Sequence, residues 1–188
     1  TFVLFICFLY FQFLKKTQKD STTLFCKILF INVGIILAAI ITDPPQSFFW
    51  VPDSIGTHLP ESIKYMKAIN GEKIDHLGEL PGKITHLTTG AIMAILGIET
   101  YSTLLSQLLF KSIALFFTYH ASKILWGKTI AQSSMLILGL TPTVFFYNIS
   151  LYKESAVQAF VAMTLFCYFK IFIEKKNLYI ILAIISLI

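Results

Sequence analysis

The chain has 188 residues, of which 56% are hydrophobic and only 13% are charged. A soluble domain carries about 25% charged residues, and the mean hydropathy here is +0.75. This composition excludes an ordinary soluble domain and predicts an integral membrane protein. The formal net charge of +5 does not indicate a nucleic-acid partner, because the Lys residues lie in short gaps between apolar runs and not on one face.

The chain opens with an apolar run at 2–14, a basic stretch at 15–23 and a second apolar run at 24–41. The first run lacks the basic leading region and the small-residue cleavage site of a signal peptide, so we interpret it as a span. Lys residues in short loops favour the cytoplasm. We therefore predict that the basic stretch lies inside the cell and that the helix at 24–41 carries the chain out.

The next segment, 42–101, is predicted to form an extracytoplasmic loop that contains the unusually polar stretch "WVPDSIGTHLPESIKYM" at 50–66. Apolar residues recur there at a helical spacing, which predicts an amphipathic helix lying along the membrane interface. These residues are Ile55, Leu59, Ile63 and Met66. Asp53 is placed to cap such a helix if it begins at Ser54. Alternatively, Pro60 marks the first turn of a shorter helix.

Segment 82–98 is apolar, but it is short for a crossing and contains His86. A full crossing would place the basic turns at 123–128 and 175–176 outside the cell. Partial entry into the outer leaflet places both turns inside, together with 15–23, which agrees with the preference of Lys for the cytoplasm. We therefore predict a second juxtamembrane helix that does not cross.

Further spans are predicted at 102–125, 129–147 and 155–173, with a truncated span at 178–188. The expected fold is all-α: a polytopic transmembrane helical bundle with extracytoplasmic juxtamembrane amphipathic helices. The chain begins without Met and stops within an apolar run, so we expect residues 1–188 to be one transmembrane domain of a longer protein.

Two sets of residues inside the predicted spans are interpreted as structural. Lys111 is an intramembrane charge, and such charges usually face a partner or a cavity, but its long apolar stem would also let the ammonium group snorkel to the interface. The cysteines have neither metal-ligand spacing nor an even number, so we expect no zinc site and no disulfide framework. They are Cys7, Cys26 and Cys167.

Several short motifs follow one another between about residues 24 and 173. A Pro-Asp-Ser step precedes a His and the amphipathic helix; then come "GIE", the aromatic-Gly turn "LWGK", the late Pro of "GLTPTVFF" and the basic-acidic pair of "LYKESAVQAF". This order resembles the N-terminal half of the GT-C-type integral membrane glycosyltransferases, the class of the protein O-mannosyltransferases and the lipid A aminoarabinose transferase. The extra span at 2–14 precedes the usual first helix of that class, and Ser follows Asp53 where the mannosyltransferases commonly have an acidic residue.

The resemblance implies transfer of a sugar from a polyprenyl-phosphate donor to an extracytoplasmic glycan, lipid or protein acceptor. It implies a location in the bacterial inner membrane. It also implies that Asp53, in the first outer loop, is the catalytic base. The second acidic residue of the catalytic site would be Glu154, which opens a later helix and would hold Lys153 in place or bind acceptor hydroxyls. In such a reaction the acceptor hydroxyl needs a general base and the departing phosphate needs a cation.

Lys153 can supply that cation as a point charge, and His58 and His86 are candidate donors to sugar or phosphate oxygens. A monophosphate-linked donor requires no metal, and no ligand cluster is evident, so we predict neither a metal nor a cofactor. Each residue also has a plain structural interpretation. Asp53 would then only cap a helix, Glu154 would pair with Lys153 at a helix mouth, and both His side chains would simply be solvated.

Two other functions remain open at the level of sequence. One is an O-antigen-type polysaccharide polymerase or ligase, which also uses polyprenyl-linked sugars. The other is a non-enzymatic transporter or assembly subunit, for which inverted repeats and polar residues at the bilayer midplane are typical. Lys111 and Asn32 are the two candidates for the second criterion.

Overall fold

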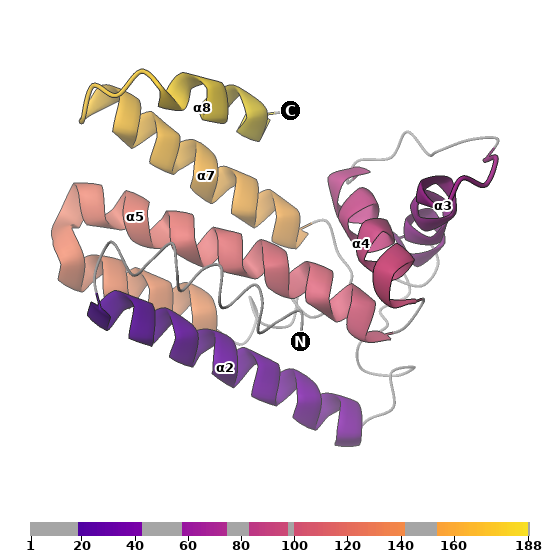
Figure 1. The fold of residues 1–188 in the computed structure, drawn as a ribbon. Coiled ribbons are helices and arrows are strands. Elements are labelled where there is room, and N and C mark those ends of the chain that lie inside the picture. Colours follow the sequence, from indigo (N-terminus) through magenta and orange to yellow (C-terminus); the bar gives the residue numbers. More distant parts are fainter. Residues whose placement is uncertain (1–18, 43–57, 75–82, 98–99, 142–153, 188) are drawn as a thin grey trace.

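A computed structural model of the chain describes residues 19–42, 58–74, 83–97, 100–141 and 154–187. These residues contain α-helices and no strand, which confirms the all-α prediction for the described part of the chain (Figure 1). In chain order the helices are α2 (Lys19–Thr42), α3 (Leu59–Ile69), α4 (Lys83–Leu96), α5 (Thr100–Leu140), α7 (Glu154–Phe172) and α8 (Tyr179–Leu187). The predicted run at 2–14 lies outside the described residues.

The predicted helices agree with the structure most closely at α7 and α8, which begin within one residue of the predicted starts at 155 and 178. The observed helix α2 is longer than the helix predicted at 24–41, because it already begins at Lys19. Hydropathy locates only the apolar part of a helix, whereas the backbone stays helical until its free amides are capped or solvated. Nothing in the polar stretch 19–23 breaks a helix.

Helix α5 is a hairpin of two helical arms that meet at Gly127. Gly127 has φ 83° and ψ −179°, a left-handed backbone conformation that glycine adopts without steric cost. Ala131 and Met135 of the second arm pack against Leu115 and Tyr119 of the first. The structure therefore confirms the turn predicted at "LWGK". The second arm is described as far as residue 141, so the rest of the span predicted at 129–147 lies outside the described residues.

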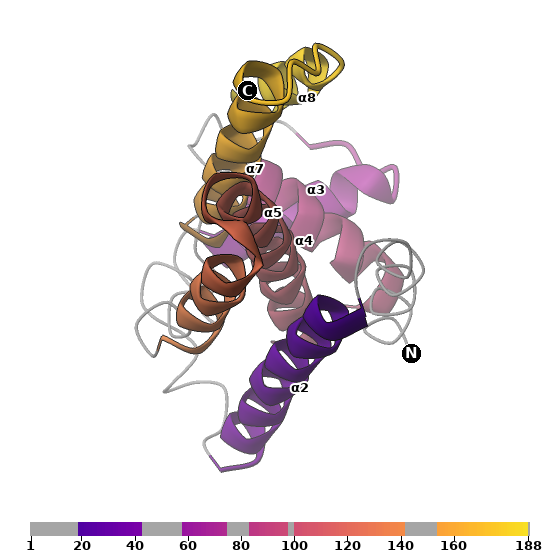
Figure 2. The ribbon, with the colours of Figure 1, turned by 90° about the vertical axis from the view of Figure 1, so that its left-hand side faces the viewer.

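The other long helices pack along the two arms of α5. Helix α2 is antiparallel to the first arm and parallel to the second, since Ser21 hydrogen-bonds Tyr119 at 2.6 Å and Asn32 donates to the Gly139 carbonyl at 3.2 Å. Helix α7 runs parallel to the first arm. Its first turn contacts Gln107, and further along it Phe166 lies 5.3 Å from Phe117 between ring centroids. Helix α8 folds back on α7 (Figures 1 and 2).

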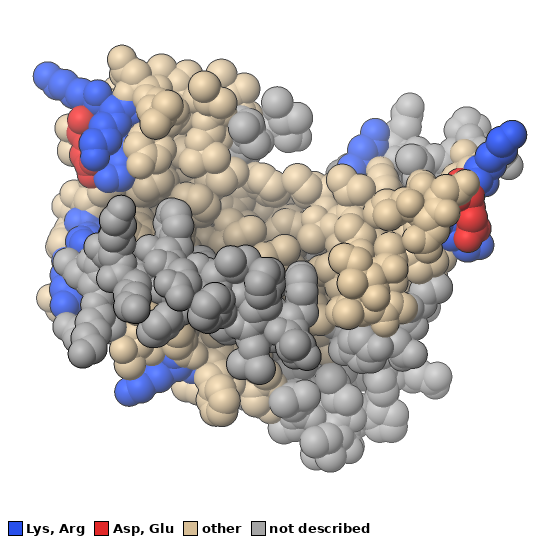
Figure 3. Space-filling view, in the orientation of Figure 1, with Lys and Arg blue, Asp and Glu red and all other residues tan. Residues whose placement is uncertain are grey.

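This packing gives the described bundle two ends. The start of α2, the Gly127 turn and the α7–α8 turn lie at one end, which we call the turn end; α3, α4 and the starts of α5 and α7 lie at the other, the α3–α4 end (Figure 1). Charged side chains gather at both ends, and the surface between them is largely uncharged (Figure 3). The Lys residues of the two turns are Lys123, Lys128, Lys170, Lys175 and Lys176.

Two helices of the described chain are long and apolar enough to cross a membrane, judged by length and composition: Ser102–Leu140 within α5, and α7. Helix α4 has 14 residues and is about 21 Å long, less than the ~30 Å hydrocarbon thickness of a bilayer. Helix α2 ends, and α5 begins, at the α3–α4 end (Figure 1). The chain between α2 and α5 therefore starts and finishes at the same end of the bundle, as expected if α4 does not cross the membrane.

Candidate functional site

Helix α3 begins at the later of the two predicted starts, the one that gives the shorter helix. His58 occupies the position before the first helical residue, and Pro60 lies in the first turn, where its missing N–H costs no hydrogen bond. Of the two predicted starts, the structure therefore agrees with the one at Pro60, and Asp53 lies outside the described residues. The apolar stripe is only half-buried at Leu59, Ile63 and Met66.

The face of α3 that packs against α4 is polar. Glu61 is 9% exposed and Ser62 is fully buried, and Ser62 donates to the His58 carbonyl at 2.8 Å. Gly90 of α4 permits the close approach. A Cβ atom at that position would lie 2.7 Å from the Ser62 carbonyl oxygen and 2.9 Å from the Met66 backbone nitrogen. The two helices therefore touch backbone to backbone, with polar side chains between them.

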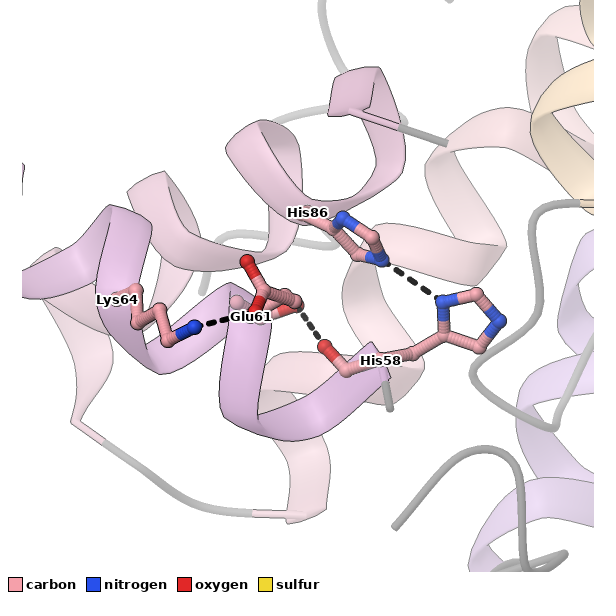
Figure 4. A network of polar contacts seen from close by, with 5 residues as sticks. His58, Glu61, Lys64 and His86 are labelled. Atoms are coloured by element: carbon pink, nitrogen blue, oxygen red, sulfur yellow. Dashed lines mark hydrogen bonds and ion pairs between the residues drawn. The ribbon is translucent and has the colours of Figure 1, made fainter. Parts of the chain in front are cut away.

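His58 and His86 are brought together in this interface, 28 residues apart in the chain (Figure 4). Nδ1 of His58 lies 2.7 Å from Nε2 of His86, and the side chains are 8% and 1% exposed. One ring nitrogen must donate and the other accept, so both rings cannot be doubly protonated while the bond exists. Nearby, Lys64 donates to Glu61 at 2.5 Å. The prediction that these His side chains are simply solvated is wrong.

Burial, with a smaller contribution from the adjacent His58, lowers the pKa of His86 to about 4, while Glu61 opposes the shift. The unfolded chain binds a proton at this side chain near pH 6.5, whereas the folded chain does not. The stabilising contribution of neutral His86 is thus complete above pH 6.5 and is lost as the pH falls toward 4.

When the pH is lowered from 7 to 5, we expect the midpoint temperature of thermal unfolding of the detergent-solubilised protein to decrease. The free energy of unfolding should decrease by roughly 1–3 kcal/mol. His86→Gln should show a smaller fall, because the glutamine does not titrate. Melting curves of both proteins at pH 7, 6 and 5 provide the measurement. An equal fall in the two would exclude the His58–His86 contact as the origin.

A second buried polar region runs along the first arm of α5. Thr103, Gln107 and Lys111 are spaced by four residues and so share one face of the helix, and they are at most 6% exposed. Ser106, beside Gln107, accepts a hydrogen bond from Thr89 of α4 at 2.8 Å. The ammonium group of Lys111 is itself buried, so the prediction that it snorkels to the interface is wrong.

The first turn of α7 meets this polar face. Ser155 is fully buried and hydrogen-bonds the side-chain amide oxygen of Gln107. Glu154, the first residue of α7, has one carboxylate oxygen, Oε2, that is buried without a hydrogen-bond partner among the described residues. In the same described part of the chain, the amide nitrogen of Gln107 and the hydroxyl of Thr85 also lack partners. The three unpaired polar atoms thus belong to three helices, α4, α5 and α7, of which α4 and α7 both contact α5.

The sequence-predicted site residues are only partly covered by these observations. Glu154, His58 and His86 all lie at the α3–α4 end, His58 with His86 in one contact and Glu154 at the start of α7. Asp53 and Lys153 lie outside the described residues. Sequence reasoning missed Thr85 and Gln107. The recurrence of polar residues at 103, 107 and 111 within an apolar helix was the signal that could have indicated Gln107.

Neither a metal site nor a disulfide is found in the described part of the chain. No group of three or more His, Cys, Asp or Glu residues there lies close enough to hold a metal ion. Cys26 and Cys167 are free thiols. The chemistry available at the α3–α4 end is therefore that of carboxylate, amide, hydroxyl and imidazole groups.

Comparison with protein-family models, with curated proteins and with solved structures finds no match to this chain. The functional assignment consequently depends on the residues and contacts described above.

Proposed function

We propose that the chain is the N-terminal part of an integral membrane glycosyltransferase that moves a sugar from a polyprenyl-phosphate donor to an extracytoplasmic acceptor. The observation that carries the proposal is the buried carboxylate oxygen of Glu154, unpaired among the described residues, at the start of α7. Buried polar groups normally have hydrogen-bond partners, and an ionisable residue within a membrane bundle indicates a functional site by default. Glu154 is also a residue to which the resemblance assigns a role.

The roles that the resemblance assigns to the other predicted site residues suit this reaction. Asp53, by resemblance, takes the proton of the acceptor hydroxyl, and Lys153 meets the departing phosphate. Glu154 lies at the α3–α4 end, where a carboxylate can accept hydrogen bonds from sugar hydroxyls. A polytopic arrangement in the bacterial inner membrane, with the α3–α4 end outside the cell, belongs to the same proposal. Its support is the grouping of the basic turns at the opposite end.

Sidedness is tested by thiol labelling of the full-length protein after its native cysteines are replaced. Lys73, just beyond α3, and Asn177, between α7 and α8, are both exposed. In intact cells a membrane-impermeant reagent should label a cysteine at position 73, whereas one at position 177 should react only after permeabilisation. Labelling of both from the same side would contradict the proposed membrane arrangement.

Catalysis is tested by incubating membranes that contain the full-length protein with polyprenyl-phosphate-linked sugars. We expect release of polyprenyl phosphate above the level of membranes without the protein. Sugar lipid that crosses the bilayer unchanged would instead identify a transporter, the function that the buried Gln107 and Lys111 side chains also allow.

A further inference from the structure

The contact between α4, the first arm of α5 and the start of α7 contains more buried polar atoms than its own hydrogen bonds satisfy. Thr85 and Gln107 are fully buried. The Thr85 hydroxyl, the Gln107 amide nitrogen and Glu154 Oε2 have no hydrogen-bond partner among the described residues. Leaving such a group unpaired destabilises the folded chain. Three in one region indicate a ligand that completes them.

These three groups come together through two measured contacts. Thr89 bonds Ser106 and Ser155 bonds Gln107, so α4 and α7 meet consecutive residues of α5. Thr85 precedes Thr89 by one helical turn, and Glu154 precedes Ser155 directly. Each group therefore belongs to a residue of these contacts, or lies one residue or one helical turn from such a residue along its own helix. Figure 3 shows the surface hollowed between the α7–α8 side and the α3–α4 side of the molecule.

The donor and acceptor pattern selects the class of ligand. A carboxylate oxygen only accepts, a threonine hydroxyl does either, and an amide presents one free atom whichever way round it is placed. A sugar hydroxyl both donates and accepts, so a sugar can pair with all three. A phosphate would face the Glu154 carboxylate as a like charge, and an apolar chain would leave all three groups unpaired.

We infer that Thr85, Gln107 and Glu154 bind the hydroxyl groups of the donor's sugar. This inference rests on the proposed function, which supplies a sugar-bearing lipid, and it assigns Thr85 and Gln107 to substrate binding. Thr85 forms no protein hydrogen bond among the described residues, so Thr85→Val removes a ligand contact without removing an internal one.

The test measures affinities of the purified full-length protein for bare polyprenyl phosphate and for a panel of polyprenyl-phosphate-linked hexoses and pentoses. We expect the wild type to bind at least one sugar-bearing lipid more tightly than the bare lipid. Thr85→Val and Gln107→Leu should weaken binding of that lipid on the order of tenfold, the equivalent of one good buried hydrogen bond, and leave the bare lipid unaffected. Thr88→Val and Gln158→Leu are matched controls, since both side chains are only half-buried.

The possible failures are distinguishable. If the wild type prefers a sugar-bearing lipid and both variants keep the full preference, the polar atoms hold only water and the inference is overturned while the proposed function stands. If the wild type prefers no sugar-bearing lipid, the proposed function and the inference both fail. Tightening of binding by added Na⁺ or K⁺ that is lost in Glu154→Gln would identify a cation site and would also overturn the inference.

Discussion

Replacing Asp53 by Asn is expected to lower sugar transfer by roughly 100-fold or more while leaving the protein in the membrane. A positioned general base typically contributes about 10²- to 10⁴-fold to such a reaction. Asparagine keeps the size of the side chain, but its amide cannot take the proton of an acceptor hydroxyl. Release of polyprenyl phosphate in membranes, normalised to the amount of inserted protein, provides the measurement.

Two comparisons make the result specific. Asp75→Asn is a matched control, because it makes the same change elsewhere in the predicted outer segment, and it should retain activity. Glu154→Gln should reduce transfer on the order of tenfold through weaker binding of hydroxyl groups and keep the acid limb of the pH–rate profile. Asp53→Asn should remove that limb. Retained activity in Asp53→Asn would exclude Asp53 as the base.

The sequence predicted helices well because hydropathy and turn residues are local signals. Helix α7 was located within one residue at each end, and the Gly-containing turn of α5 was expected from "LWGK" alone. Pro60 likewise indicated one of two starts for α3, and the structure selects the later one. Each of these features depends on residues within a few positions of one another.

The candidate site was predictable only in part, because its contacts join residues far apart in the chain. A hydropathy pattern treats His58 and His86 as polar and therefore exposed, and it carries no information that they hydrogen-bond across 28 residues. An amphipathic helix is expected to expose the polar residues opposite its apolar stripe, yet Glu61 and Ser62 of α3 are buried. Packing between helices decides these positions, and a single sequence does not report it.

Gly90→Ala is expected to destabilise the packing of α3 on α4 by about 1–3 kcal/mol, the usual cost of forcing an extra carbon into a filled interface. The new Cβ would lie 2.7 Å from the Ser62 carbonyl oxygen and 2.8 Å from Tyr65 Cβ. The first of these neighbours is helix backbone, which cannot turn away as a flexible side chain can. Helix α3 must therefore move as a whole, and the His58–His86 hydrogen bond lengthens with it.

Hydrogen exchange of the detergent-solubilised full-length protein, followed by mass spectrometry, measures this effect helix by helix. Exchange should accelerate in α3 and α4 and stay unchanged in α7, which packs on the first arm of α5. Gly34→Ala is the matched control, because a Cβ there meets nothing within 4 Å and alanine favours a helix by up to about 1 kcal/mol. Unchanged exchange in α3 of Gly90→Ala would mean that α3 does not pack backbone to backbone on α4. The His58–His86 contact, and the pH dependence expected from it, would then have to be abandoned as well.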